Sequence, residues 1–264
     1  MTLVMGILNV TPDSFSDGGR FSTADAAITR GLELAAQGAH IVDVGGESTR
    51  PGANRVGPAE ELNRVLPVVT ALADAGVTVS IDTMNASTAR AAADAGAAIV
   101  NDVSGGLADP AMPATVAGLD VDYVCMHWRA HSTTMDQLDV YDDVVADVHN
   151  ELLTRVHALV DAGVDVKRII LDPGLGFSKV GDNNWTLLAH IDVLRGLGQR
   201  VLIGASRKRF LGGDDPSARE NATTAVTALA AFHGAWAVRV HDARAAADAI
   251  AVASAWHNAV SAPE

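Results

Sequence analysis

The sequence predicts an α/β fold of the (β/α)8 TIM-barrel class, in which eight parallel strands alternate with helices. One repeated pattern supports this: an Ala-rich stretch, a glycine, and a short apolar run that ends on a polar residue. It occurs in AAQGAHIVDV, DAGVTVSID, DAGAAIVND and DAGVDVKRIILD. Each glycine stands where a helix C-terminus favours a left-handed residue. The length is the second observation, because 264 residues accommodate eight such units in a single domain, expected to span residues 1–264.

Eight short apolar runs are the expected strands. They are nearly continuous rather than alternating, as in parallel strands that are buried on both faces. In chain order they are Leu3–Leu8, His40–Val44, Val77–Ile81, Ala98–Val100, Val121–Cys125, Arg168–Leu171, Val201–Ile203 and Trp236–Val240.

Helices are expected between these strands, where apolar residues recur at helical spacing. They are Thr23–Gln37, Pro58–Ala75, Ser87–Ala95, Pro113–Ala117, Tyr141–Ala162, Asn184–Leu194, Glu220–Phe232 and Arg244–His257. An open, doubly wound sheet is the structural alternative. It is less favoured because NVTPDS, after the first strand, lacks the G-x-G-x-x-G pattern of such folds.

Composition limits the partners. The net charge of −13 and the pI of about 5.0 argue against nucleic acid and anionic membranes. Cys125 is the only cysteine, so no intramolecular disulfide can form, as suits a reducing cytoplasm. The N-terminus lacks the features of a signal peptide, and no apolar stretch approaches the roughly 18–20 residues of a membrane helix. We therefore expect a soluble, cytoplasmic protein.

Polar residues follow almost every expected strand. In a TIM barrel the carboxyl ends of the strands carry the active site. Asp82, Asn101 and Asp172 together could bind a flat heterocycle with N–H and amino groups, because a carboxylate accepts two such bonds at once. A single Asp in this place is more often a turn or helix-cap residue, but three such residues favour a site.

Basic residues gather after the last two strands, where such barrels often bind phosphate. Lys208 follows the seventh strand, Arg239 and His241 end the eighth, and Arg50 lies in an earlier loop. The alternation in Arg239-Val240-His241 places both basic side chains on one side of the strand. The alternative is that these cations pair with neighbouring carboxylates: Asp43, Asp102 or Asp242.

Other chemistries are poorly supported. Asn9 can offer an oxygen to Mg²⁺ or equally close a turn. His127 has no Cys or His at zinc-ligand spacing, and Ser206 lacks the G-x-S-x-G frame of a hydrolase triad. Cys125 is expected to be a buried, inert thiol.

With these residues in place, the chain resembles the dihydropteroate synthases. The matching motifs run in collinear order from Met5 to about Trp256. They are MGILNVTPDSFSDGG, IVDVGGESTRPGA, VSIDT, NDVSGG, LDPGLGF, GASRKRFLG and RVHD, while MHWR is similar to the actinobacterial members in particular. The resemblance implies a folate-pathway transferase. Such an enzyme condenses p-aminobenzoate with 6-hydroxymethyl-7,8-dihydropterin diphosphate, giving 7,8-dihydropteroate and diphosphate.

Residue by residue, the resemblance implies the following roles. Pterin would be bound by Asp82, Asn101 and Asp172, with Lys208 near its ring, and Met126 and Gly204 would also contact substrate. Arg239 and His241 would anchor the diphosphate, and Asn9 would bind Mg²⁺. The aminobenzoate pocket, where sulfonamides compete in this family, would involve Thr49, Arg50, Pro51, Phe177 and Ser206.

The resemblance also places Asp17, Arg50 and Lys208 among the catalytic residues. It implies that the first two loops close over the substrates, and that two copies form a homodimer through their last helices. Two alternatives remain: a pterin-binding methyltransferase that serves a corrinoid partner, and a non-catalytic pterin-binding paralogue. The first would not need SRKRF and RVHD, and the second should have lost some of these anchors.

Overall fold

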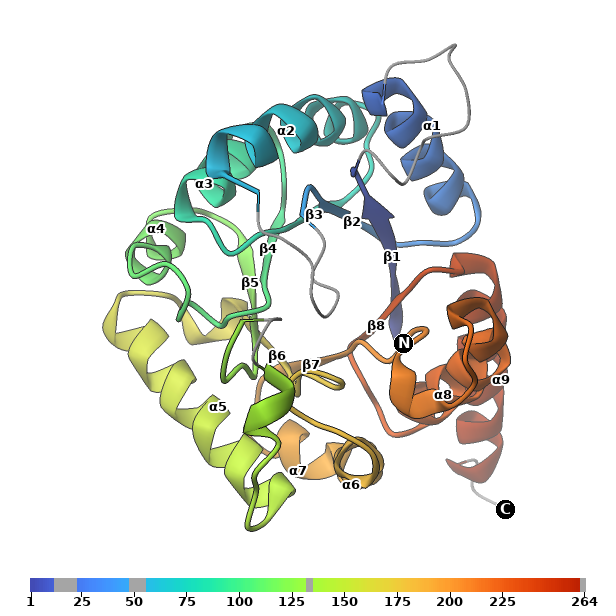
Figure 1. The fold of residues 1–264 in the computed structure, drawn as a ribbon. Coiled ribbons are helices and arrows are strands. Elements are labelled where there is room, and N and C mark those ends of the chain that lie inside the picture. The colour runs from blue at the N-terminus through green and yellow to red at the C-terminus, as the bar shows by residue number, and fades with distance from the viewer. Residues whose placement is uncertain (12–22, 48–55, 132–134, 262–264) are drawn as a thin grey trace.

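Eight parallel strands form a closed barrel surrounded by helices (Figure 1). The computed structural model describes residues 1–11, 23–47, 56–131 and 135–261. The strand order follows the sequence, and β8 pairs with β1 to close the barrel. The predicted fold class is therefore confirmed. The strands are β1 (Leu3–Asn9), β2 (Ile41–Gly45), β3 (Val79–Asp82), β4 (Ile99–Asp102), β5 (Asp122–Met126), β6 (Ile169–Asp172), β7 (Arg200–Ile203) and β8 (Ala237–Val240).

The helices lie close to the predicted ranges. They are α1 (Thr23–Ala36), α2 (Pro58–Asp74), α3 (Ala86–Asp94), α4 (Met112–Ala117), α5 (Val144–Asp161), α6 (Asp182–Ala189), α7 (Ile191–Arg195), α8 (Glu220–Phe232) and α9 (Ala243–Ser261). The single helix expected over Asn184–Leu194 is wrong, because the chain leaves helical geometry at His190 and forms α6 and α7. The His190 ring contacts the carbonyl of Thr186 at 2.8 Å, a local contact that competes with helix continuation.

Two apolar clusters separate the inside of the barrel from its outside. The larger cluster joins the outer faces of the strands to the helices. The smaller one contains alternate strand residues and fills the barrel floor with Met5, Ile41, Ile99, Val124, Ile170, Leu202 and Ala237. Two residues further along each strand the same inward face becomes mostly polar, at Asp43, Asn101, Asp172 and Arg239, because strand side chains repeat with a period of two.

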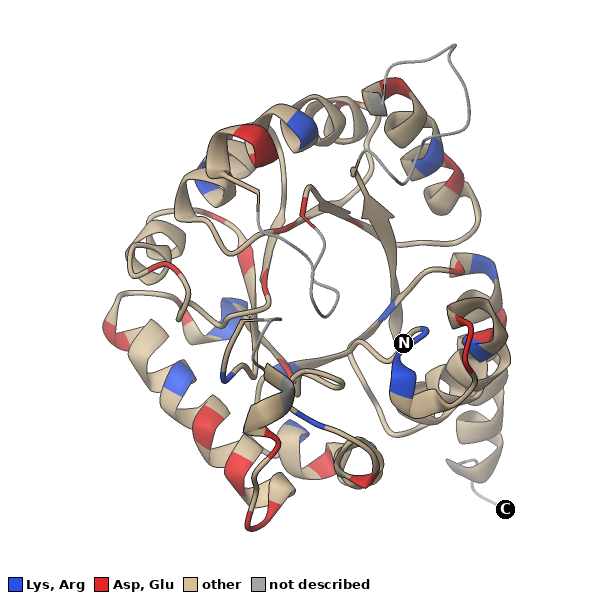
Figure 2. Cartoon of the chain, in the orientation of Figure 1, with Lys and Arg blue, Asp and Glu red and all other residues tan. Residues whose placement is uncertain are grey.

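The helix-to-strand turns contain the glycines that the repeat predicts. Gly96, for example, has a φ of +104°, and a Cβ there would lie 2.8 Å from the Cβ of Ala73. A larger residue would therefore be strained and crowded at this turn. In the described part of the chain, no helix combines the length and apolar character needed to cross a membrane. Figure 2 shows acidic and basic segments both on the outer helices and on the strands around the barrel centre.

Asp102 points outward from β4 and organises the loop that follows. Its oxygens accept hydrogen bonds from the backbone N–H groups of Ser104 and Gly106, from the Ser104 hydroxyl and from the Tyr123 hydroxyl. Burial raises the pKa of Asp102, and these hydrogen bonds oppose the rise. Asp102 is therefore a structural residue, not a partner of the basic residues at the top of the barrel.

We expect Tyr123→Phe to lower the free energy of unfolding by about 1–3 kcal/mol, because a buried carboxylate loses one donor while the ring keeps its packing. Urea unfolding followed by circular dichroism measures this change. An unchanged midpoint would contradict the structural role of the Tyr123–Asp102 bond, which spans 2.8 Å.

Candidate active site

An ion-pair network occupies the centre of the barrel, just above its apolar floor. Arg239 on β8 donates from Nε to Asp43 and from an η-nitrogen to Asp82, both at 2.6 Å. The side-chain amide of Asn101 donates to the same oxygen of Asp43 at 3.0 Å. Residues from β2, β3, β4 and β8 are thus joined across the barrel interior.

Asp43 is the residue of this network that is not among the site residues predicted from the sequence. It is fully buried, and its second oxygen, Oδ1, has no hydrogen-bond partner. The available signal was its spacing, because Asp43 lies two residues after the inward-facing Ile41. The alternative considered from the sequence, that Arg239 pairs with a neighbouring carboxylate, is correct as a description of this contact.

Burial and neighbouring charges act in opposite directions on the pKa values of this network. Burial raises the pKa of the Asp82 carboxyl; Arg239 lowers it and Asp43 raises it again. For Arg239, burial acts to lower the pKa, but Asp43 and Asp82 together raise it above its ordinary value. The guanidinium therefore remains charged and is the counterion of two buried carboxylates.

Asp172 lies at the end of β6, opposite this network. Its Oδ1 accepts the N–H of Gly174 at 2.7 Å. Burial raises its pKa, and the ammonium of Lys208 opposes this most strongly. Burial in turn lowers the pKa of Lys208 to about 8, and the charge of Asp172 opposes this decrease. The Lys208 nitrogen donates to the carbonyl of Leu175 and lies 4.6 Å from the centre of the Phe177 ring.

The neighbouring strand ends complete this surface. Met126 pairs in register with Asp172, and a Cβ on Gly204 would lie 3.5 Å from an oxygen of Asp172. The absence of a side chain at Gly204 therefore leaves Asp172 open toward the barrel axis. Asn9 ends β1 on the inward face, since it continues the alternation from Met5, and it is half-buried.

His241 and Ser206 connect the last two strands. The Ser206 hydroxyl lies 2.9 Å from Nδ1 of His241, and the His241 backbone N–H donates to it at 3.2 Å. His241 also lines a pocket of about 450 Å³ with basic walls. The other lining residues are Arg30, Gln37, Arg207, Asp242 and Arg244. This margin of the barrel can attract an anion.

The structure thus brings together Asp82, Asn101, Met126, Asp172, Phe177, Gly204, Ser206, Lys208, Arg239 and His241 at one end of the barrel, with Asn9 on the same edge. The predicted residues Asp17, Thr49, Arg50 and Pro51 lie outside the described residues. Within the described ranges, no three His, Cys, Asp or Glu side chains are grouped so that they could hold a metal ion.

Comparison with known proteins identifies the family of the chain. Residues 5–241 match the family described as pterin binding enzyme. The chain is 54% identical to the dihydropteroate synthase of Mycobacterium leprae over 97% of this chain and 94% of that relative.

Two solved structures from Xanthomonas albilineans show the same fold. Its dihydropteroate synthase with 4-aminobenzoic acid superposes with a TM-score of 0.92 at 44% identity, covering 99% of this chain and 94% of the other. The same enzyme in complex with 7,8-dihydropteroate gives 0.88 at 42% identity, covering 99% and 95%. The chain therefore belongs to the pterin-binding enzymes and, among them, to the dihydropteroate synthases. Membership makes it a transferase of folate biosynthesis that forms a carbon–nitrogen bond.

Proposed function

We propose that this chain joins p-aminobenzoate to 6-hydroxymethyl-7,8-dihydropterin diphosphate at the carboxyl end of its barrel. The observation that carries the assignment is the convergence of two buried carboxylates, Asp82 and Asp172, with Asn101 and with the cations Lys208 and Arg239. Carboxylates suit the N–H and amino donors of a pterin ring, and cations suit a diphosphate. Release of diphosphate from the two substrates, measured with the purified chain, tests this function directly.

The pterin head is held at the centre of the site. One oxygen of Asp172 is occupied by the N–H of Gly174, so the other faces the open space above Gly204 and can accept from the pterin. Asn101 donates its amide nitrogen to Asp43, so its carbonyl oxygen is the group it can present to a ligand donor. These fixed partners orient the acceptors before substrate arrives.

The diphosphate is held by Arg239 and His241. Arg239 uses two of the five N–H donors of a guanidinium for Asp43 and Asp82, so three can still reach phosphate oxygens. His241 follows Arg239 by two residues and lines the basic pocket together with Arg207 and Arg244. The aminobenzoate lies by Phe177. The Lys208 ammonium lies 4.6 Å from the centre of the Phe177 ring and also acts on the pterin carboxylate Asp172, so it stands where the two substrates meet.

Asn9 would hold Mg²⁺ together with the diphosphate. Mg²⁺ in such sites keeps several waters and takes few protein oxygens besides those of the substrate phosphates. An inward-facing amide oxygen at the end of β1 fits that requirement. When bound, Mg²⁺ neutralises charge on the diphosphate.

The reaction needs no covalent nucleophile. The C–O bond to diphosphate breaks and its electron pair leaves with the diphosphate, while the dihydropterin ring spreads the positive charge. The arylamine nitrogen then forms the C–N bond and gives up a proton. Arg239 and His241 stabilise the leaving anion, and Asp82 and Asp172 keep the ring in place for the attack.

Helices α8 and α9 form the surface through which two copies associate. They lie side by side on one edge of the barrel (Figure 1). Four apolar residues on them are more than half exposed: Leu229, Val252, Trp256 and Val260. An apolar patch of this kind on a globular protein favours burial against a partner, and a second copy of this chain is the partner we propose.

We expect Asp82→Ala and Asp172→Ala each to weaken pterin binding by about 1.5–3 kcal/mol, because each removes a charge-assisted acceptor from a buried pocket. Calorimetric titration with a pterin measures the loss, and Asp122→Ala, at the opposite, amino-terminal end of the strands, is the control. Unchanged affinity in both variants would mean that pterin binds elsewhere.

We expect His241→Ala to weaken binding of the pterin diphosphate about tenfold while pteroate binding changes little, because pteroate lacks the diphosphate. Arg239→Ala should weaken both ligands and lower the free energy of unfolding by about 3–5 kcal/mol, since Asp43 and Asp82 would lose their counterion. Paired titrations of both variants make the test. Equal losses for the two ligands in His241→Ala would exclude His241 as a diphosphate anchor.

We expect Trp256→Glu to convert dimers to monomers, because a charge would be placed in the apolar patch of α8 and α9. Sedimentation velocity at several concentrations measures the change. Val140→Glu puts the same charge on another exposed side chain, outside these helices, and should leave the mass unchanged. A monomer in the unmodified protein would rule out the homodimer.

A further inference from the structure

Lys179 is a buried cation in the loop that follows β6. Only 3% of its surface is exposed. Its nitrogen lies 2.8 Å from Nδ1 of His127, 3.2 Å from the carbonyl of Gly174 and 3.0 Å from the carbonyl of Phe177. The family resemblance and the proposed chemistry give this residue no role.

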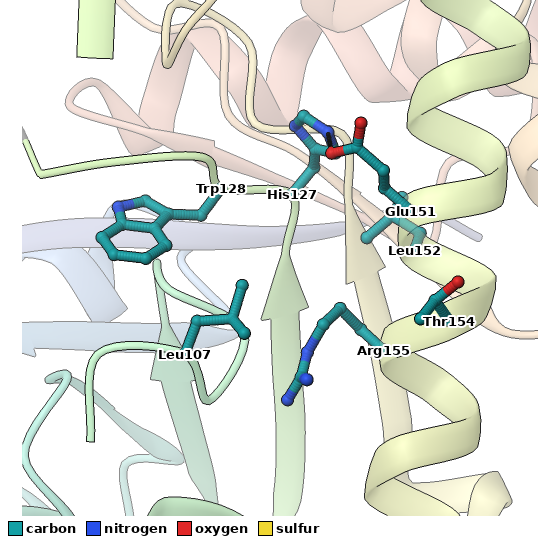
Figure 3. A pocket seen from close by; sticks show the side chains of 7 residues that line it. All are labelled: Leu107, His127, Trp128, Glu151, Leu152, Thr154 and Arg155. Carbon is teal, nitrogen blue, oxygen red and sulfur yellow. Dashed lines mark hydrogen bonds and ion pairs between the residues drawn. The ribbon is translucent and has the colours of Figure 1, made fainter. Parts of the chain in front are cut away.

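The hydrogen bonds around His127 indicate that Lys179 is charged. On the other side of the ring, Nε2 lies 2.8 Å from a carboxylate oxygen of Glu151, and Figure 3 shows the ring turned toward this side chain of α5. A carboxylate only accepts, so Nε2 carries the proton and Nδ1 of the neutral ring accepts from Lys179. Three acceptors then surround the Lys179 nitrogen, and only the ammonium form has three protons to donate.

The loop held by Lys179 has a backbone that needs such support. Gly174, Gly176 and Ser178 have positive φ angles of 67°, 70° and 49°, and Ser178 is not a glycine. The two glycines adopt such angles readily, but Ser178 is strained there, and a strained residue persists only when its surroundings hold it. Besides the two carbonyls bonded by Lys179, the carbonyl of Ser178 accepts from the Tyr141 hydroxyl at 2.9 Å.

Phe177 lies in the middle of this loop, between its two lysine contacts. Lys179 holds its carbonyl, and Lys208 donates to Leu175 and faces the Phe177 ring. We propose that Lys179, clamped as an ammonium ion by neutral His127, is a positioning residue that fixes Phe177 and thereby shapes the aminobenzoate pocket. This inference rests on the proposed function, in which Phe177 lines the aminobenzoate pocket.

The surrounding charges define a pH window for the clamp. Burial lowers the pKa of Lys179 to about 7; Asp172 and Glu151 oppose this, while Lys208 and Arg129 add to it. Burial and the Lys179 charge lower the pKa of His127 to about 4. The Tyr141 ring, 5.9 Å from the Lys179 nitrogen, completes the surroundings. Above about pH 7 Lys179 loses a proton and with it one of its three donors. Below about pH 4 His127 becomes protonated on Nδ1, which then faces Lys179 as a second donor.

The first test compares Lys179→Met with Lys167→Met, the same change at an exposed lysine. For Lys179→Met we expect the KM for p-aminobenzoate to rise about tenfold, with kcat and the KM for pterin diphosphate nearly unchanged, because only the aminobenzoate pocket is loosened. Lys179→Gln retains two donors and should give an intermediate KM. A Lys179→Met enzyme with the KM of Lys167→Met would overturn the proposal.

The second test is the pH profile, which a merely space-filling lysine would not change. The chain has only three lysines, Lys167, Lys179 and Lys208, so ¹³C-labelled lysine gives three side-chain signals that the variants assign. In the unmodified enzyme, the KM for p-aminobenzoate should rise with increasing pH, and the midpoint of this rise should coincide with the titration midpoint of Lys179. In Lys179→Met this rise should disappear, while the titration of Lys208 at about pH 8 remains. If the KM for p-aminobenzoate in the unmodified enzyme does not change across the pH range in which Lys179 titrates, the clamp is refuted, even if both variants fail to fold.

Phe177→Ala separates failure of this proposal from failure of the underlying function. If it leaves the KM for p-aminobenzoate unchanged, the pocket assignment is wrong. If it raises that KM while Lys179→Met behaves like Lys167→Met, the pocket is correctly placed and only the positioning role of Lys179 fails.

Discussion

The paired contact of Arg239 with Asp43 and Asp82 is the interaction on which the active end of the barrel depends. Three charged groups are placed in a space that helices and strands shield from water, and each alone would be costly to bury. Together they form two ion pairs of 2.6 Å and connect β8 with β2 and β3 across the interior. Asn101 joins them through Asp43, so the acceptors available to a pterin are already oriented.

The apolar floor below this network contributes stability that offsets the free-energy cost of burying these charges. Met5, Ile41, Val124, Ile170 and Leu202 fill the lower barrel, and the outer faces of the strands pack against the helices. Stability therefore comes from the floor and the outer layer, while the upper layer carries charges and a strained loop. This division agrees with the general separation of stability and function between the two ends of TIM barrels.

In the loop after β6, as in the network, cations hold the chain in place by bonding acceptors in the interior. Ser178 has a left-handed backbone that residues other than glycine rarely adopt, and the loop is surrounded by His127 after β5, Tyr141 before α5 and Lys208 in the β7–α8 connection. Lys179 donates to the carbonyls of Gly174 and Phe177, and Lys208 donates to that of Leu175. An acidic protein with a net charge of −13 thus has a small set of cations in the interior of this end of the barrel, where carboxylates and loop carbonyls are their partners.

The sequence by itself determined the eightfold alternation, the strand ends and most of the site, because apolar periodicity and strand polarity are local properties of the chain. It placed Asp82, Asn101, Asp172 and Lys208 together without a structure, since parallel strands bring their carboxyl ends to one edge. The sequence did not predict the break between α6 and α7 at His190, because this break depends on a contact between a side chain and a nearby carbonyl.

Only the tertiary structure decided which charges pair. Asp43 and Asp102 are both acidic residues of strands, yet one faces inward to Arg239 and the other outward to Tyr123. The clamp of Lys179 on His127 and the carbonyls of its own loop likewise joins residues 52 positions apart. Such pairings depend on the register of neighbouring strands and on burial, and neither is encoded in any short stretch of sequence.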